Sequence, residues 1–166
     1  MTAQPDAETA ARFDAWRRAH YPAHLNRVPA HITLFHSLPA ADLATIEDAL
    51  AERCWDLDPL HARATGLVGT GRGVAIEIDS PALVRLRAEF ARLWSGWLTP
   101  QDRRRLAPHV TIQNKVPPSK ARLTLQALEP LFEPFSFTVE AIRIWRYKGG
   151  PWERVATYPL GAAPTD

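Results

Sequence analysis

The chain has 166 residues, of which 46% are hydrophobic and 23% charged, and this composition predicts one globular domain with a packed core. Its single cysteine, Cys54, excludes an internal disulfide and a zinc site built from several cysteines. The net charge of +2 at pH 7 permits an anionic ligand without demonstrating one. There is no apolar run long enough to span a membrane and no secretory signal, so we expect a cytoplasmic protein that makes no membrane contact.

Hydrophobic spacing in the first half of the chain predicts two helices and three strands. Residues 6–20 carry apolar side chains at helical spacing, and Asp6 is placed to cap that helix. Residues 2–6 show no strand character, so a strand ahead of the first helix is not expected. The predicted elements are a helix over 6–20, a strand over 28–38, a helix over 40–54, and strands over 61–68 and 74–78 joined by a glycine-rich turn at 69–73.

The second half is predicted to begin with a helix at Ser80 and Pro81, because serine is favoured at the N-cap and proline at the first helical position. The remaining predicted elements are a polar loop over 96–106, a strand over 108–116, a helix over 119–132 with Ser119 as a candidate cap, a strand over 135–147, a turn at 149–151 and a last strand over 152–160. We interpret Arg72 and the loop residues 103–105 as solvated charges. Helices combined with mostly antiparallel strands predict an α+β fold.

Two segments that lie 78 residues apart resemble each other. Each contains a histidine, an apolar residue, a threonine and a second apolar residue, and each has a proline eight residues after the histidine. His31 and Thr33 in the first copy therefore align with His109 and Thr111 in the second. A helical stretch follows each copy. The repeat predicts a duplicated unit and a two-lobed protein with pseudo-twofold symmetry.

The repeated residues are suited to acid–base chemistry on a phosphodiester. Side chains at positions i and i+2 of a strand share one face, so each copy presents an imidazole and a hydroxyl together. An imidazole with a pKa of about 6.5 accepts or donates a proton near neutral pH, and threonine hydroxyls can donate to phosphoryl oxygens. These groups need no metal. We predict that His31 and His109 are catalytic and that Thr33 and Thr111 bind the phosphate.

Two aromatic or polar residues continue the same strands. Phe35 and Gln113 each lie two residues beyond a motif threonine, so we expect them to line the substrate cleft, although Phe35 could instead pack between the lobes. Trp145 and Tyr147 could line the rim of the cleft, but we favour core packing for them. The other histidines have no comparable context, and we interpret them as surface or packing residues: His20, His24, His36 and His61.

The paired motif, histidine-apolar-threonine-apolar, resembles the signature of the 2H phosphoesterase superfamily. Within it the chain most resembles the bacterial 2′-5′ RNA ligases, also described as RNA 2′,3′-cyclic phosphodiesterases, over roughly residues 7–147. The resemblance implies a single bilobal domain over residues 1–166, in which two antiparallel sheets flank a water-filled cleft with helices outside. It also implies RNA ends or nucleotides with a cyclic phosphate as partners, and no metal or nucleotide cofactor. We expect a monomer.

The implied activity is hydrolysis of a 2′,3′-cyclic phosphate to a 2′-phosphate. By the same resemblance His31 would protonate the departing 3′ oxygen and His109 would activate water, although the two sites are nearly symmetric. Three alternatives remain open from the sequence. They are a 2′-5′ RNA ligase acting on tRNA halves, a non-catalytic module that binds RNA or a nucleotide, and a metal site that uses His31 and His109.

Overall fold

The computed structural model describes residues 1–149 and 152–161. Within them the strands are β1 (Thr2–Pro5), β2 (Ile32–Thr33), β3 (Leu60–Gly69), β4 (Val74–Asp79), β5 (His109–Gln113), β6 (Phe135–Tyr147) and β7 (Trp152–Pro159). The α-helices are α1 (Ala7–His20), α2 (Leu43–Trp55), α3 (Pro81–Leu93) and α4 (Pro118–Leu128). Short 3-10 helices cover Ala23–Leu25, Ala40–Asp42 and Glu129–Leu131. Gly150 and Pro151 of the expected turn lie outside the described residues. The α+β class is confirmed.

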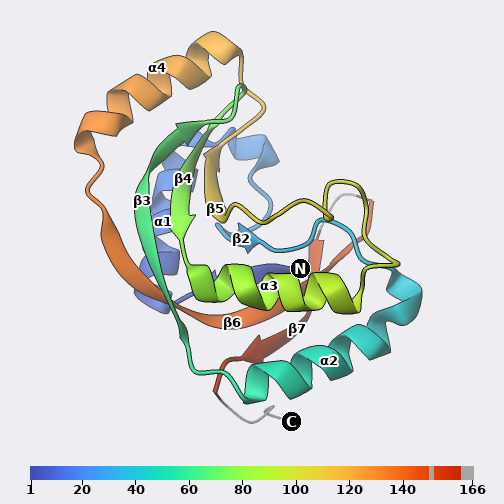
Figure 1. Cartoon of the computed structure of the whole chain (residues 1–166). Helices are drawn as coiled ribbons and strands as arrows, with labels where there is room; N and C mark the ends of the chain where they lie inside the picture. Colours follow the sequence, from blue (N-terminus) through green and yellow to red (C-terminus); the bar gives the residue numbers. More distant parts are fainter. Residues whose placement is uncertain (150–151, 162–166) are drawn as a thin grey trace.

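The strands form one antiparallel sheet, so the prediction of two separate sheets is wrong (Figure 1). Its order is β1-β2-β5-β4-β3-β6-β7, and β1 also pairs with β6. The first six strands therefore close into a ring, and β7 pairs with β6 beside it. The two halves share one sheet because β2 of the first half pairs directly with β5 of the second.

The first strand, β1, is a feature that the sequence did not predict. Thr2 pairs with Thr33 of β2 on one side and with Arg143 of β6 on the other, and Ala3 is fully buried between the same strands. Pro5 is accommodated at the end of the strand, where the register with β6 shifts. Strand formation here depends on pairing along both edges, which outweighs the weak local strand propensity of these residues.

The second strand, β2, is much shorter than the predicted strand over residues 28–38. Only Ile32 and Thr33 belong to a ladder. Several other backbone N–H groups of this segment bind carboxylates instead: Ala30 N donates to Asp14 (2.6 Å), while His36 N and Ser37 N donate to Asp102 (2.9 and 3.1 Å). Because these donors are satisfied by side chains, the segment does not need strand partners along its whole length.

Two predicted helix caps are confirmed, and one is wrong. The Asp6 carboxylate accepts the N–H of Thr9 at 2.8 Å, and Ser80 Oγ accepts the N–H of Leu83 at 3.4 Å. The fourth helix begins instead at Pro118, with Pro117 at the N-cap and no side-chain cap from Ser119. This helix ends at Leu128, and the residues up to 131 form a 3-10 turn that contains Pro130, which lacks the N–H that an α-helix requires.

The hydrophobic core lies between the sheet and the helices. Phe13 of α1 packs edge-on against Phe137 of β6, with ring centroids 5.6 Å apart. On another side of the core, Trp94 stacks on Phe90 at the end of α3, with centroids 4.8 Å apart. The first of these contacts joins α1 to the sheet, and the second lies within the C-terminal end of α3. Among the described residues, none of the helices is long and apolar enough to cross a membrane.

Candidate active site

The two copies of the repeat meet in the β2–β5 ladder. Ile32 pairs with Val110 in an antiparallel register. Extending this register by one residue in each direction places His31 opposite Thr111 and Thr33 opposite His109. Residues that lie opposite each other in an antiparallel pair project from the same face of the sheet. All four motif side chains therefore share one face, and the two histidines lie on a diagonal of this group, about 7–8 Å apart at the backbone.

Burial across the sheet separates the motif face from the core face. The row that contains Ile32 and Val110 continues into Ala3 and Ile76, and all four of these residues are buried. In the neighbouring row, Thr2 pairs with Thr33, and Thr33 is partly accessible. His109 is exposed. The apolar residues of each motif thus anchor the sheet to the core, while the histidines and threonines are available to a ligand.

Both catalytic candidates are held in the same tautomer. His31 Nδ1 lies 2.7 Å from the carbonyl oxygen of Pro29, and His109 Nδ1 lies 2.9 Å from the carbonyl oxygen of Ala107. A carbonyl oxygen can only accept a hydrogen bond, so Nδ1 carries the proton in each ring. In the neutral imidazole, Nε2 then has a free lone pair that can take a proton from a substrate or a water molecule.

The two histidines differ in their electrostatic surroundings. Burial lowers the pKa of His31 below its usual value of 6.5, while the hydrogen bond to Pro29 opposes this shift. The positive charges of Arg17 and of the N-terminal amine lower the pKa of His31 further. The neutral form of His31 is therefore favoured at neutral pH.

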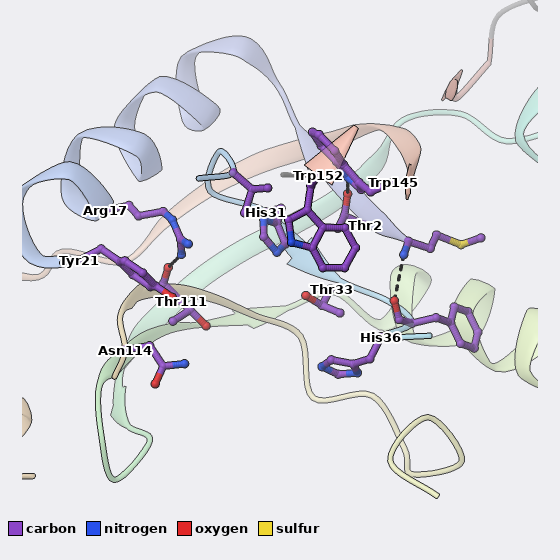
Figure 2. Close-up of a pocket in the computed structure, with 13 residues that line it drawn as sticks. Thr2, Arg17, Tyr21, His31, Thr33, His36, Thr111, Asn114, Trp145 and Trp152 are labelled. Carbon is purple, nitrogen blue, oxygen red and sulfur yellow. Dashed lines mark hydrogen bonds between the residues drawn. The ribbon is translucent and has the colours of Figure 1, made fainter. Parts of the chain in front are cut away.

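A pocket of about 270 Å³ opens over the motif face (Figure 2). His31, Thr33 and Thr111 line it, whereas His109 is not among its lining residues. The other lining residues are Met1, Thr2, Arg17, Tyr21, Val28, Phe35, His36, Asn114, Trp145 and Trp152. Within the described part of the chain, no group of three or more histidine, cysteine, aspartate or glutamate side chains is arranged to hold a metal ion.

A family model of the 2′-5′ RNA ligase superfamily matches residues 5–151 of the chain. The chain belongs to the 2′-5′ RNA ligase superfamily. Among solved structures it is similar to TT0787 of Thermus thermophilus, with 20% sequence identity and a TM-score of 0.60 over 99% of this chain and 97% of that one. At this identity the similarity concerns the fold. No curated protein sequence matches the chain.

The two residues predicted to continue the motif strands, Phe35 and Gln113, are both buried. Phe35 borders the pocket but is only 1% exposed, because its ring packs against Trp94 at a centroid distance of 5.5 Å. The guanidinium of Arg87 lies 4.6 Å from the centroid of the same ring. Phe35 therefore follows the packing alternative. The chain has already left the ladder at this residue, so strand alternation no longer sets its direction.

Gln113 does not reach the pocket. Two consecutive residues of β4 pair with Thr111 and Gln113, which are not consecutive in β5. Ile112 is therefore an additional residue in β5, and it interrupts the alternation of side chains along this strand. The Gln113 side chain is buried and donates a hydrogen bond to Thr124 Oγ1 of α4 at 2.8 Å. The extra residue, which no sequence pattern indicates, explains why the expectation for Gln113 is not met.

A buried arginine from the first helix supplies positive charge beside the motifs. Arg17 Nη1 donates to the carbonyl oxygen of Thr111 at 2.6 Å, and its Nε donates to Asn26 at 2.7 Å. The guanidinium also lies over the ring of Tyr21, 3.9 Å from its centroid. These contacts hold the charge in the pocket wall, where it can attract an anion (Figure 2). The sequence offers no signal that separates Arg17 from the other basic residues of its helix.

On the opposite side of the pocket lies His36, which the sequence analysis assigned to the surface or to packing. Its Nδ1 is 3.0 Å from Asp102 Oδ1, and its Nε2 is 3.1 Å from Gln101 Nε2. Asn114 occupies the position equivalent to His36 in the repeat, five residues after the motif histidine. Both residues line the pocket. This correspondence is visible in the sequence and is a signal by which the two positions can be found.

Two tryptophans complete the wall. Trp145 lines the pocket and is not part of the core, contrary to the interpretation that we favoured from the sequence. Its indole N–H donates to Thr2 Oγ1 at 2.9 Å, which ties β6 to β1 at the pocket. Trp152, at the start of β7, also lines the pocket. Tyr147 lies outside this pocket and is 59% exposed.

Proposed function

We propose that this protein is a phosphodiesterase that opens nucleoside or RNA 2′,3′-cyclic phosphates to 2′-phosphates, with His31 and His109 as its acid–base pair. The observation that carries the proposal is the β2–β5 register, which brings two histidines and two threonines to one accessible face. Two titrating groups that flank one phosphorus centre are what in-line displacement at a phosphodiester requires. Membership in the 2′-5′ RNA ligase superfamily supports the same class of chemistry.

In the proposed step, water attacks the phosphorus while one imidazole removes its proton. The bond between phosphorus and the 3′ oxygen breaks, and the other imidazole donates its Nε2 proton to that oxygen. The hydroxyls of Thr33 and Thr111 donate to the non-bridging oxygens, where negative charge accumulates. The products are a 2′-phosphate and a free 3′ hydroxyl. Protons balance within the pair, because one ring gains the proton that the other loses.

The electrostatics favour one assignment of the two roles. A base must be neutral before the reaction, and the lowered pKa of His31 favours its neutral form. His109 is exposed and would donate the proton to the leaving oxygen. This is the reverse of the roles that the resemblance implies. We therefore propose His31 as the base and His109 as the acid in the direction of hydrolysis.

The test is a panel of cyclic phosphodiesters incubated with the protein in the presence of a chelator. We expect ring opening to the 2′-phosphate, and no turnover by the variant that carries both His31→Ala and His109→Ala. Parallel incubation with tRNA halves examines ligation. Joining without hydrolysis would replace the proposed activity with a ligase, and binding without turnover of any substrate would leave a non-catalytic module.

A further inference from the structure

One positive charge near the motifs has no acidic partner. Arg17 of α1 is only 5% exposed, although a buried arginine is usually paired with a carboxylate. Within the described part of the chain, Arg17 forms no ion pair. Asp14, which lies earlier on the same helix, accepts the N–H of Ala30 at 2.6 Å instead. The fold therefore keeps a buried cation without a counter-charge, which is costly unless the position serves a ligand.

The pocket that Arg17 lines is suited to an anion. Among the described residues, its lining contains no aspartate or glutamate, whereas Arg17 is positive and both His31 and His36 can become so. The hydrogen bonds from Arg17 to Asn26 and to the carbonyl oxygen of Thr111 use only part of the N–H donors that a guanidinium carries. The remaining donors are available to a ligand in the pocket.

Arg17 lies beside the motif residues (Figure 2). Its Nη1 is 2.6 Å from the carbonyl oxygen of Thr111, and Thr111 lies opposite His31 in the β2–β5 ladder. Burial lowers the pKa of His31, and the charge of Arg17 lowers it further. The ring of Tyr21 covers the guanidinium at 3.9 Å and holds it from a second side. A fixed planar fork of donors beside an imidazole and a hydroxyl matches the oxygens of a phosphate.

We propose that Arg17 is a further catalytic residue, whose guanidinium binds the non-bridging oxygens of the phosphate and stabilises the transition state. This inference rests on the proposed function and adds a group that the paired motif does not contain. The substrate diester carries a single negative charge, and attack by water places more negative charge on the same oxygens. Because the guanidinium is held in place and shielded from water, it stabilises the transition state more than the ground state. Arg17 stays protonated throughout, so the proton balance of the histidine pair is unchanged.

The experiment compares Arg17→Met with Arg18→Met, which changes an exposed arginine of the same helix. The value of kcat is taken at the plateau of each pH profile, so that a change in the ionisation of His31 does not contribute. We expect Arg17→Met to lower kcat by about 10²–10³-fold, the usual cost of removing one fixed donor to a developing charge, and to change KM by less than about 10-fold. Arg17→Lys keeps the charge without the planar fork and should give an intermediate kcat. Arg18→Met should retain the wild-type kcat.

Titration with inorganic phosphate separates a ligand role from a structural one. We expect Arg17→Met to weaken phosphate binding at least about 10-fold, in line with the loss of a charge-assisted hydrogen bond. In the wild-type protein, the Nε–H resonance of Arg17 should shift as phosphate is added, and this measurement stands even if Arg17→Met does not fold. A lower kcat in Arg17→Met without weaker phosphate binding would overturn the proposal, and so would a resonance that phosphate does not move. Arg17 would then only tie α1 to Thr111.

Failure of the proposed function has a different outcome, because the wild-type protein would then open no cyclic phosphodiester. In that case the phosphate titration alone decides the role of Arg17. Phosphate binding that is weakened by Arg17→Met and not by Arg18→Met would retain an anion site in a non-catalytic protein. Binding that is equal in all three proteins, or absent from the wild-type protein, would reject it.

Discussion

Ile32 pairs with Val110 across the β2–β5 ladder, and both side chains are completely buried. These two residues occupy equivalent positions in the repeat, one residue after each motif histidine. The two copies of the repeat therefore meet at this pair. The histidine of each copy lies opposite the threonine of the other, so each half of the chain supplies one acid–base group and one hydroxyl to a common site.

Removal of either motif histidine should lower kcat by about 10²–10⁴-fold, which is the usual contribution of a general acid or base. His31→Ala and His109→Ala are measured with a nucleoside 2′,3′-cyclic phosphate. His24→Ala is the matched control, because this exposed histidine lines none of the cavities near the site. Turnover near the wild-type rate in either motif variant would contradict the assigned pair.

Removal of a motif hydroxyl should have a smaller effect than removal of an imidazole. Thr33→Ala and Thr111→Ala each delete one donor to the phosphoryl oxygens, and we expect a cost of about 1–3 kcal/mol in transition-state binding. This corresponds to a loss of roughly 5–150-fold in kcat/KM. Thr33→Ser and Thr111→Ser keep the hydroxyl and should retain most of the activity. Equal losses in the serine and alanine variants would indicate that the methyl group matters and the hydroxyl does not.

The ionisation of His31 should be displaced to low pH. Because burial and the charge of Arg17 both lower its pKa, titration of the His31 ring followed by NMR should have a midpoint below 6.5. Arg17→Gln removes the positive charge and should raise this midpoint, whereas Arg17→Lys keeps the charge and should raise it less. The acid limb of the kcat/KM profile should move with the midpoint. A midpoint that is the same in all three proteins would exclude electrostatic coupling between these residues.

Asp102 should stabilise the fold as an anion. Its buried carboxylate accepts the N–H groups of His36 and Ser37 and the hydroxyl of Thr99. Burial raises the pKa of Asp102, but the hydrogen bonds outweigh burial and the net pKa lies below its usual 3.8. The contribution to stability is therefore complete above the unfolded-state pKa and is lost as pH falls through the folded-state pKa.

The corresponding experiment is urea unfolding at several pH values. Asp102→Ala leaves the N–H groups of His36 and Ser37 without their acceptor, and we expect the free energy of unfolding at pH 7 to fall by about 1–3 kcal/mol. The difference from the wild-type protein should shrink as the solution is acidified below the usual carboxyl pKa. Asp58→Ala, at an exposed position, should change the stability by less than about 0.5 kcal/mol.

The sequence was sufficient to find the motif pair because strand alternation and the repeat are local patterns. His31, Thr33 and Thr111 line the pocket over this face, and His109 is not among its lining residues. What could not be predicted depends on contacts between distant residues. The strand at Thr2–Pro5 exists because β2 and β6 hold both of its edges, and this pairing leaves no trace in the local composition.

The pocket residues outside the motifs were harder to predict from the sequence, for the same reason. The additional residue at Ile112 redirects Gln113, and the carboxylate of Asp102 replaces the ladder partners of His36 and Ser37. Neither the additional residue nor the carboxylate alters the hydrophobic pattern that indicates a strand. Arg17 is separated from Thr111 by 94 positions, so its contribution depends entirely on how α1 packs against β5.

The similarity of the motifs on either side of Ile32 and Val110 raises the question of which way round a substrate binds. Two equivalent motifs do not distinguish one end of an asymmetric ester from the other, so the motifs alone do not fix the direction in which a substrate binds. The discrimination must come from positions that differ between the two copies of the repeat, where one flank carries His36 with the Asp102 carboxylate and the other carries Asn114. Divergence at those flanks, with the central motifs left intact, is a route by which this scaffold can acquire new substrates without rebuilding its chemistry.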